Sequence, residues 1–141
     1  MPPAGFIPAT IVQALRDQPV PLEGDGSRSR DWLHVEDYCA GVFIALLDGI
    51  PGTVHHFASG HRMRDLDLVQ RILEHLGRSG DLLQMHAGTG GSPPDFVPRP
   101  ADRAALDSLA WKPRQGLEEG LRATIDWYVR NREWWEPAPV R

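Results

Sequence analysis

The sequence predicts an α/β fold that is rich in helix and contains only a few short strands. Several stretches of the 141-residue chain place apolar side chains three or four positions apart, which is the period of a helix with one buried face. Fourteen glycines and thirteen prolines interrupt the chain, so the elements between them must be short. The length suits one compact domain over residues 1–141 with a single core.

Five segments are predicted to be helical, because apolar spacing marks their buried face and Gly or Pro marks their ends. They cover about 8–16, 37–47, 66–76, 101–109 and 117–132. Acidic residues near several N-termini suit the positive end of the helix dipole. Cys39 lies on the apolar face of the helix at 37–47, where we expect a small side chain to be buried.

Four short segments are predicted to be extended. Strand-like composition marks 20–22, Asp31–Val35, Thr53–Ala58 and Leu82–His86, and the third of these is expected to be buried. Residues 23–27, EGDGS, have the composition of a turn. The Gly- and Pro-rich stretch at 87–100 is predicted to be a long loop and a candidate lid.

Composition limits the kinds of partner. The net charge is −4 and Lys112 is the only lysine, so a nucleic acid is not expected as the main partner. No apolar run approaches the roughly 18 residues of a membrane span, and the first residues lack the features of a secretion signal. A single cysteine, Cys39, suits a reducing compartment, and we expect a cytoplasmic protein.

Three stretches of sequence carry a resemblance to a known family. Residues 19–37 read PVPLEGDGSRSRDWLHVED, residues 52–61 read GTVHHFASGH, and LAWKP at 109–113 is followed by LEEGLRATIDWY and EWW. In this order they resemble the C-terminal part of extended short-chain dehydrogenase/reductases, the NAD-dependent epimerase/dehydratase family, and most closely its nucleotide-sugar dehydratases, which are lyases. The resemblance covers about residues 6–135. It implies a helix-rich substrate-binding part that lacks the Rossmann sheet.

The resemblance also says where the chemistry of the family lies. The missing N-terminal part binds NAD on a glycine-rich turn and carries a catalytic Tyr-x-x-x-Lys pair, in which the lysine tunes the tyrosine for acid/base work. The position four residues after each tyrosine holds no lysine: it is Val42 for Tyr38 and Arg132 for Tyr128. The position four residues before Lys112 holds a serine and not a tyrosine. We therefore expect no catalytic residue and no cofactor site in this chain, and no hydride transfer by the chain alone.

The glycine-rich segments do not replace the missing NAD site. The turn at 24–29 lacks a third glycine, and the glycines at 88–91 precede two prolines instead of a helix. With a separate NAD-binding chain, the resemblance implies oxidation at C4 of the sugar, loss of water across C5 and C6, and return of the hydride.

Part of the substrate site is implied by the same resemblance. Arg30 matches the arginine that reaches the diphosphate of a nucleotide sugar, and a guanidinium can donate two hydrogen bonds to phosphate oxygens. Pro21 matches a proline that packs on the base. Arg99 is close enough in sequence to replace a lost phosphate-binding arginine if its loop folds back. The alternative for Arg30 is an ion pair with Asp31, Glu36 or Asp37.

Two acidic residues depart from the family pattern and predict weak binding. Glu23 stands where a base-stacking tyrosine is expected, and Asp65 stands near the place of a phosphate-binding asparagine. Like charges a few ångströms apart repel each other by about 1 kcal/mol in water and more at a partly buried surface.

No metal site or nucleophile is predicted. His55 and His56 would point to opposite faces of a strand, and no cysteine or carboxylate completes a familiar ligand spacing with them or with His61. The serines lack a recognisable nucleophile motif. His34 is explained by packing. Tryptophans 134 and 135 are expected to pack at the end of the last helix, and some apolar surface near them is expected to be open.

The sequence thus predicts a weak nucleotide-sugar-binding portion of a dehydratase-like enzyme that is inactive alone. We expect it to pair with itself or with a separate NAD-binding chain. A repurposed, non-catalytic interaction or scaffold protein is the alternative from another class, and Glu23, Asp65 and the eroded loop favour it. A small stand-alone enzyme that uses the long loop is a third possibility, which no motif supports directly.

Overall fold

The computed structural model describes residues 5–87 and 109–136. Three expected features lie outside these residues: Arg99, the expected helix at 101–109 except for Leu109, and all but the first residue of the expected lid. The chain divides into two compact units. The first takes in Met1–Ser29, Arg64–Ser92 and Leu121–Arg141, and the second Arg30–Met63 and Pro93–Gly120. The single domain expected over residues 1–141 stays a prediction.

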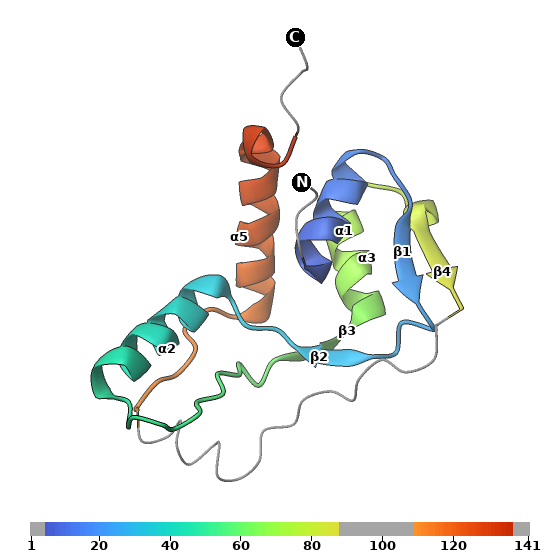
Figure 1. The fold of residues 1–141 in the computed structure, drawn as a ribbon. Helices are drawn as coiled ribbons and strands as arrows, with labels where there is room; N and C mark the ends of the chain where they lie inside the picture. The colour runs from blue at the N-terminus through green and yellow to red at the C-terminus, as the bar shows by residue number, and fades with distance from the viewer. Residues whose placement is uncertain (1–4, 88–108, 137–141) are drawn as a thin grey trace. The chain divides into compact units, whose positions relative to one another are not determined.

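The first unit packs helices beside a parallel pair of strands. Its elements are α1 (Phe6–Leu15), β1 (Val20–Glu23), α3 (Asp65–His75), the 3₁₀ helix η1 (Gly80–Leu82), β4 (Leu83–His86), most of α5 (Leu117–Arg130) and the 3₁₀ helix η2 (Arg132–Trp134). β1 and β4 pair with Val20 opposite Leu83 and Glu23 opposite His86. α1 and α3 lie side by side next to this pair (Figure 1).

The core of the first unit comes from the apolar spacing of its helices. Fully or almost fully buried side chains are contributed by α1, β1, α3 and α5, and they include Ile11, Ala14, Val20, Leu22, Leu68, Val69, Ile72, Leu73, Leu121 and Ile125. The helices expected at 8–16 and 66–76 are therefore confirmed. α1 begins two residues earlier than expected, because Pro8 falls in the first helical turn, where its missing N–H would have no partner.

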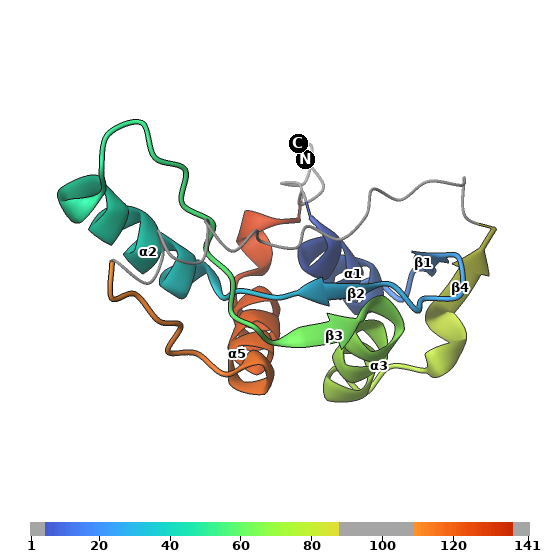
Figure 2. The same cartoon turned by 90° about the horizontal axis from the view of Figure 1, so that it is seen from below.

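The second unit is built around α2 (Val35–Asp48). It also contains most of β2 (Ser29–Asp31) and most of β3 (Arg62–Arg64), which pair to form a second two-stranded sheet (Figure 2). α2 begins after His34, whose extended backbone and ring Nδ1 cap the helix, with Nδ1 accepting from the N–H of Glu36 at 3.3 Å. Packing alone does not explain His34, although its ring also approaches Gly120.

A buried carboxylate ties α2 to the segment before α5. Asp37 is 4% exposed, and its two oxygens accept the backbone N–H groups of Arg114 at 3.1 Å and Gln115 at 2.9 Å. Its carbonyl accepts from Nε1 of Trp111 at 3.1 Å. The helix dipole is therefore not the only reason for an acid here.

The strand expected at Asp31–Val35 is wrong in its bounds, because β2 ends where that prediction begins. After β2 the N–H of Trp32 donates to the carbonyl of His61 at 3.2 Å, and His34 already serves as the cap of α2. The residues between β2 and α2 thus turn the chain into the helix. The expected strand at Leu82–His86 is confirmed as β4.

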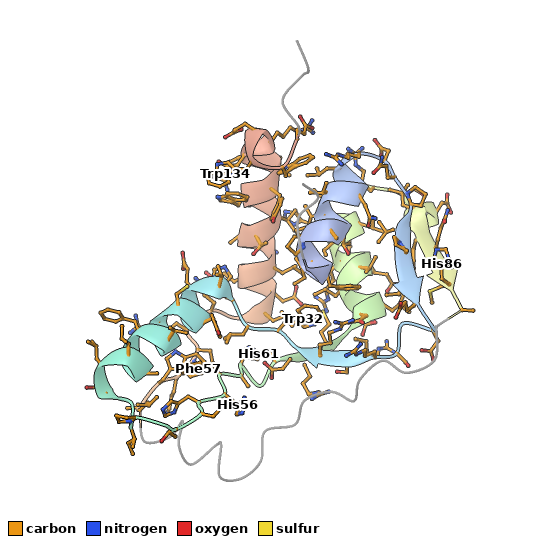
Figure 3. All side chains as sticks on the ribbon, in the orientation of Figure 1. Trp32, His56, Phe57, His61, His86 and Trp134 are labelled. Carbon is orange, nitrogen blue, oxygen red and sulfur yellow. The ribbon has the colours of Figure 1, made fainter. Side chains whose placement is uncertain are left out.

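The buried strand expected at Thr53–Ala58 is also wrong. Residues 53–59 have no strand beside them among the described residues, and Thr53 and Val54 are exposed. Without a ladder, the segment is held by side chains. Phe57 packs edge-on against Trp111, with ring centroids 5.0 Å apart, and lies against α2 (Figure 3).

The apolar face expected to bury Cys39 is exposed instead. Cys39 itself is exposed, and the other members of the face share this state: Val42, Phe43, Leu46 and Leu47. α2 contacts the rest of its unit through a different side, on which Gly41 faces the ring of Phe57. The helix itself is confirmed, with bounds two residues earlier and one residue later than expected.

The tryptophans that follow α5 have different environments. Trp135 is buried, its Nε1 donates to the carbonyl of Tyr128 at 2.9 Å, and the guanidinium of Arg16 lies 5.3 Å from the centre of its ring. Trp134 is 76% exposed and neighbours the ring of Trp127 (Figure 3). Packing thus accounts for Trp135 and not for Trp134.

The fold class is confirmed: the described residues are rich in helix, and their strands form only small two-stranded sheets. None of the helices in this part of the chain has both the length and the apolar character that crossing a bilayer demands.

We predict that Gly41→Ala destabilises the protein, although alanine is the better helix former by about 1 kcal/mol. A Cβ at this position would lie 2.7 Å from ring carbons of Phe57, and that ring is already held against Trp111. The expected net loss is about 1–3 kcal/mol of unfolding free energy, measured by urea denaturation. Phe57→Leu should recover part of it, and a stabilised Gly41→Ala protein would contradict this packing.

Candidate functional site

The turn after β1 has a backbone that only glycine adopts easily. Gly24 and Gly26 have φ angles of 66° and 68°, and the Asp25 carboxylate accepts the N–H of Ser27 at 2.9 Å. A Cβ on Gly26 would lie 2.6 Å from Leu22 and 2.8 Å from Leu66. The second glycine is therefore required by both conformation and packing, and the predicted turn is confirmed.

This turn is attached to the N-terminus of α3. The carbonyl of Arg28 accepts the N–H of Asp65 at 2.8 Å, and the carbonyl of Gly26 accepts the N–H of Leu66 at 3.1 Å. A dinucleotide pyrophosphate needs free N–H groups at a helix that directly follows a glycine turn. Here β2 follows the turn, and these two N–H groups of α3 are occupied. The residues of this turn do not fit the pyrophosphate of NAD.

Charges near the turn form a small network in the first unit. Arg64 donates to both carboxylate oxygens of Asp67, at 2.7 and 2.8 Å. The hydrogen bond from Arg64 holds the pKa of Asp67 below its usual range. The hydrogen bonds from Ser27 likewise lower the pKa of Asp25. These groups are at the surface, so salt will weaken their interaction.

Arg30 lies on β2 in the second unit and is half-buried. Its guanidinium carbon lies 5.9 Å from the centre of the Trp32 ring, which is within the range of a cation–π contact. The indole Nε1 of Trp32 donates to the carbonyl of Met63 on β3 at 3.4 Å. The aromatic ring that neighbours Arg30 is thus itself attached to the sheet.

Asp31 anchors the strand that carries Arg30, and sequence reasoning assigned this residue no such role. Its Oδ1 accepts from the N–H of Ser59 at 2.7 Å and from the Ser59 hydroxyl at 2.9 Å, and its Oδ2 accepts from the N–H of Gly60 at 2.7 Å. The same hydroxyl lies 2.8 Å from the carbonyl of Trp32. The sequence signal for this role was the Ser59-Gly60 pair directly after the strand-like stretch at 53–58. Serine and glycine are typical of turns.

Pro21 and Arg99, the other two predicted binding residues, do not belong to the described part of the second unit. Pro21 is exposed on β1 in the first unit, while Arg30 belongs to the second, and Arg99 is outside the described residues. Glu23 is exposed at the end of β1. Asp65 differs from the expectation, because it is only 4% exposed and its carboxylate does not face solvent. Of the two acids expected to repel an anion, the first unit presents only Glu23 to solvent.

The histidines are not arranged as metal ligands. Within residues 5–87 and 109–136, no group of three or more His, Cys, Asp or Glu side chains could hold an ion. Both ring nitrogens of His55 are buried and accept or donate no hydrogen bond there. In the first unit, Nε2 of His75 lies 3.1 Å from Oδ1 of Asp126, and this contact links α3 to α5.

Comparison with known proteins places the chain in a family. The model of the NAD dependent epimerase/dehydratase family matches residues 1–57. A dTDP-glucose 4,6-dehydratase from Streptomyces antibioticus is 37% identical over 99% of this chain and 41% of its own length. The chain thus spans about two fifths of the length of the curated relatives that it matches.

Solved structures give the same result. The crystal structure of DesIV, a dTDP-glucose 4,6-dehydratase from Streptomyces venezuelae with NAD and TYD bound, matches with a TM-score of 0.85 and 28% identity, over 94% of this chain and 41% of that one. A UDP-glucuronic acid 4-epimerase from Bacillus cereus, in complex with UDP-glucuronic acid and NAD, matches with a TM-score of 0.78 and 25% identity, over 91% and 40%.

The chain belongs to the NAD-dependent epimerase/dehydratase family of extended short-chain dehydrogenase/reductases. It corresponds to the C-terminal part of these enzymes and is similar to dTDP-glucose 4,6-dehydratase. The resemblance inferred from the three sequence stretches is confirmed.

We predict that Asp67→Asn reduces the acid sensitivity of the protein. The pKa of Asp67 is lower in the folded chain than in the unfolded one, so its contribution is present above about pH 4 and is lost as the pH falls through the folded-state value. The melting temperature of the variant should fall less between about pH 5 and pH 2 than that of the wild type. Glu133→Gln, at an exposed site in η2, is the control, and equal slopes for both variants would refute the prediction.

Proposed function

We propose that this chain is the nucleotide-sugar-binding portion of an enzyme similar to dTDP-glucose 4,6-dehydratase, and that it does not catalyse the reaction by itself. The observation that carries the proposal is the anchored position of Arg30. The solved relative in complex with UDP-glucuronic acid supports the ligand class, because that molecule is a nucleotide sugar.

Arg30 has the chemistry that a diphosphate needs. Its planar guanidinium group can donate two parallel hydrogen bonds to phosphate oxygens. The neighbouring Trp32 ring limits the directions that the side chain can take, and Asp31, which lies between the two residues in the chain, anchors the end of β2. A residue restricted in this way loses less conformational entropy when it binds an anion. Pro21 and Arg99 are assigned to the base and the phosphates by resemblance alone.

The proposed inactivity rests on the residues that are present. An acid/base pair of the family type requires tyrosine and lysine four positions apart, and the 141 residues contain no such pair. Carbonyl groups of the glycine turn at 24–29 already accept the first N–H groups of α3, so this turn does not fit the pyrophosphate of NAD. In this proposal a separate polypeptide supplies every reacting group, and this chain orients the ligand by its phosphates.

Isothermal titration with dTDP-glucose and dTDP tests the binding proposal. We expect weak, salt-dependent binding that Arg30→Ala reduces by about tenfold or more, since hydrogen bonds to charged groups contribute about 1.5–3 kcal/mol. Arg30→Lys should recover only part of the affinity, because lysine cannot form the two parallel bonds. The matched control is Arg122→Ala, which removes an exposed arginine from α5. No binding by the wild type, or equal binding by Arg30→Ala, would refute the proposal.

An activity assay tests the proposed inactivity. The purified chain is incubated with dTDP-glucose and NAD, and loss of one water from the sugar nucleotide is followed by mass spectrometry. We expect no product above the rate in buffer. A full-length relative, assayed in parallel, shows that the conditions allow the reaction. Product formed by this chain alone would overturn the proposal of inactivity and leave the binding result untouched.

A second candidate function is a non-catalytic interaction or scaffold protein. The exposed apolar face of α2 and the exposed carboxylate of Glu23 favour it, because the first suits a protein partner and the second disfavours an anionic ligand. Titration separates the two: a chain that forms a stable protein complex in sedimentation and has no affinity for dTDP-glucose is a scaffold.

A further inference from the structure

The pairing of β2 with β3 brings a second ionisable side chain close to Arg30. The N–H of Trp32 donates to the carbonyl of His61 at 3.2 Å, and these two residues lie next to each other (Figure 3). The N–H of Asp65 donates to the carbonyl of Arg28 at 2.8 Å. Later residues of β2 thus pair with earlier residues of β3. The two strands are therefore antiparallel, and His61 lies directly opposite Trp32.

Arg30, Trp32 and His61 share one face of this sheet. Side chains two positions apart on a strand point to the same side, and so do those of directly opposite residues. The guanidinium carbon of Arg30 lies 5.9 Å from the centre of the Trp32 ring, which agrees with a common side. Arg30 and His61 are therefore diagonal neighbours across the two strands. Long side chains in such positions can reach each other, so they can also contact one ligand.

The backbone of His61 is held by the same group that anchors β2. Its N–H donates to the Ser59 hydroxyl at 2.9 Å, and that hydroxyl lies 2.9 Å from Oδ1 of Asp31. Its carbonyl accepts from the N–H of Trp32. The positions of Arg30 and His61 are thus fixed by one set of hydrogen bonds. Two side chains on a backbone held in this way lose less conformational entropy when they bind a common ligand.

The surroundings of His61 suit a negatively charged ligand. The residue is exposed. On its face of the sheet, β2 contributes the positive charge of Arg30 and β3 contributes the uncharged Met63. Asp31 and Arg62 are directly opposite each other in the same register and belong to the other face. The nearest carboxylate in the sheet therefore does not compete with a ligand for His61.

We propose that His61 is a second binding residue for the diphosphate of a nucleotide sugar, and that it binds the diphosphate in its protonated form. Each of the two phosphates carries a negative charge, and Arg30 supplies only one positive charge. Histidine side chains change their charge between about pH 5 and pH 8. A diphosphate next to the ring favours the charged form, so binding takes up a proton in this range. The proposal rests on the proposed function, because it requires the ligand to lie beside Arg30.

Isothermal titration with dTDP-glucose at about pH 6 and about pH 8, at constant ionic strength, tests the proposal. Both phosphates of this ligand are diesters, so their charge is the same at the two pH values. We expect the wild type to bind about threefold or more tightly at the lower pH, because a charged donor forms the stronger hydrogen bond. Titration near pH 7 in two buffers with different enthalpies of ionisation should show net proton uptake.

His61→Gln is the test variant, since glutamine keeps a hydrogen-bond donor and cannot become charged. It should bind about as tightly as the wild type near pH 8 and about threefold or more weakly near pH 6, with no proton uptake. His75→Gln is the matched control, because it removes the same titratable group from the contact with Asp126 in the first unit. It should retain both the pH dependence and the proton uptake.

Three outcomes would overturn the proposal. They are equal affinity of the wild type at the two pH values, a pH dependence that persists in His61→Gln, and the same loss in His75→Gln. Circular dichroism checks that each variant keeps its helices, and proton uptake by the wild type needs no variant. Binding that depends on Arg30 and not on His61 would refute this proposal alone. No binding by the wild type at either pH would refute the proposed function itself.

Discussion

The second compact unit depends on two carboxylates that accept backbone N–H groups. Asp31 binds Ser59 and Gly60, and Asp37 binds Arg114 and Gln115. Segments that lack strand partners would otherwise leave these N–H groups without acceptors, which is costly wherever water is excluded. Hydrogen bonds to a charged acceptor are stronger than those between neutral groups. Two carboxylates can therefore hold these segments in place without a longer ladder of strand hydrogen bonds. The positions of β2 and α2, and with them of Arg30, follow from these bonds.

The two units differ in how their backbone segments are held together. The first has a core of interlocking helix faces, a parallel strand pair, and a glycine turn whose carbonyls accept the first N–H groups of α3. The second has an exposed apolar stripe, a strand-like segment outside any sheet, and His55 with both ring nitrogens buried and unbonded among the described residues. Hydrogen bonds to Asp31 and Asp37 thus hold the second unit in places where the first has a strand pair and packed helices.

The proposed function combines a binding role with the absence of catalysis, and the two have different structural requirements. A phosphate contact needs one well-positioned guanidinium, and a short strand anchored by Asp31 is enough to hold Arg30. Acid/base catalysis needs several groups at fixed distances from one another and from a cofactor. Binding and catalysis therefore need not be lost together when a family fold is divided.

Much of the first unit could be predicted from the sequence by itself, because its helices, its turn and β4 depend on local spacing and on residues such as Gly26 and Pro8 whose backbone preferences are intrinsic. The family was indicated separately, by the resemblance of three contiguous sequence stretches to its members. Only the tertiary structure decided three features. They are the exposure of Cys39, the lack of a strand at 53–58, and the hydrogen bonds of Asp31 and Asp37. Each depends on a partner distant in the chain, and apolar periodicity shows that a face must be covered without showing whether the covering layer is present.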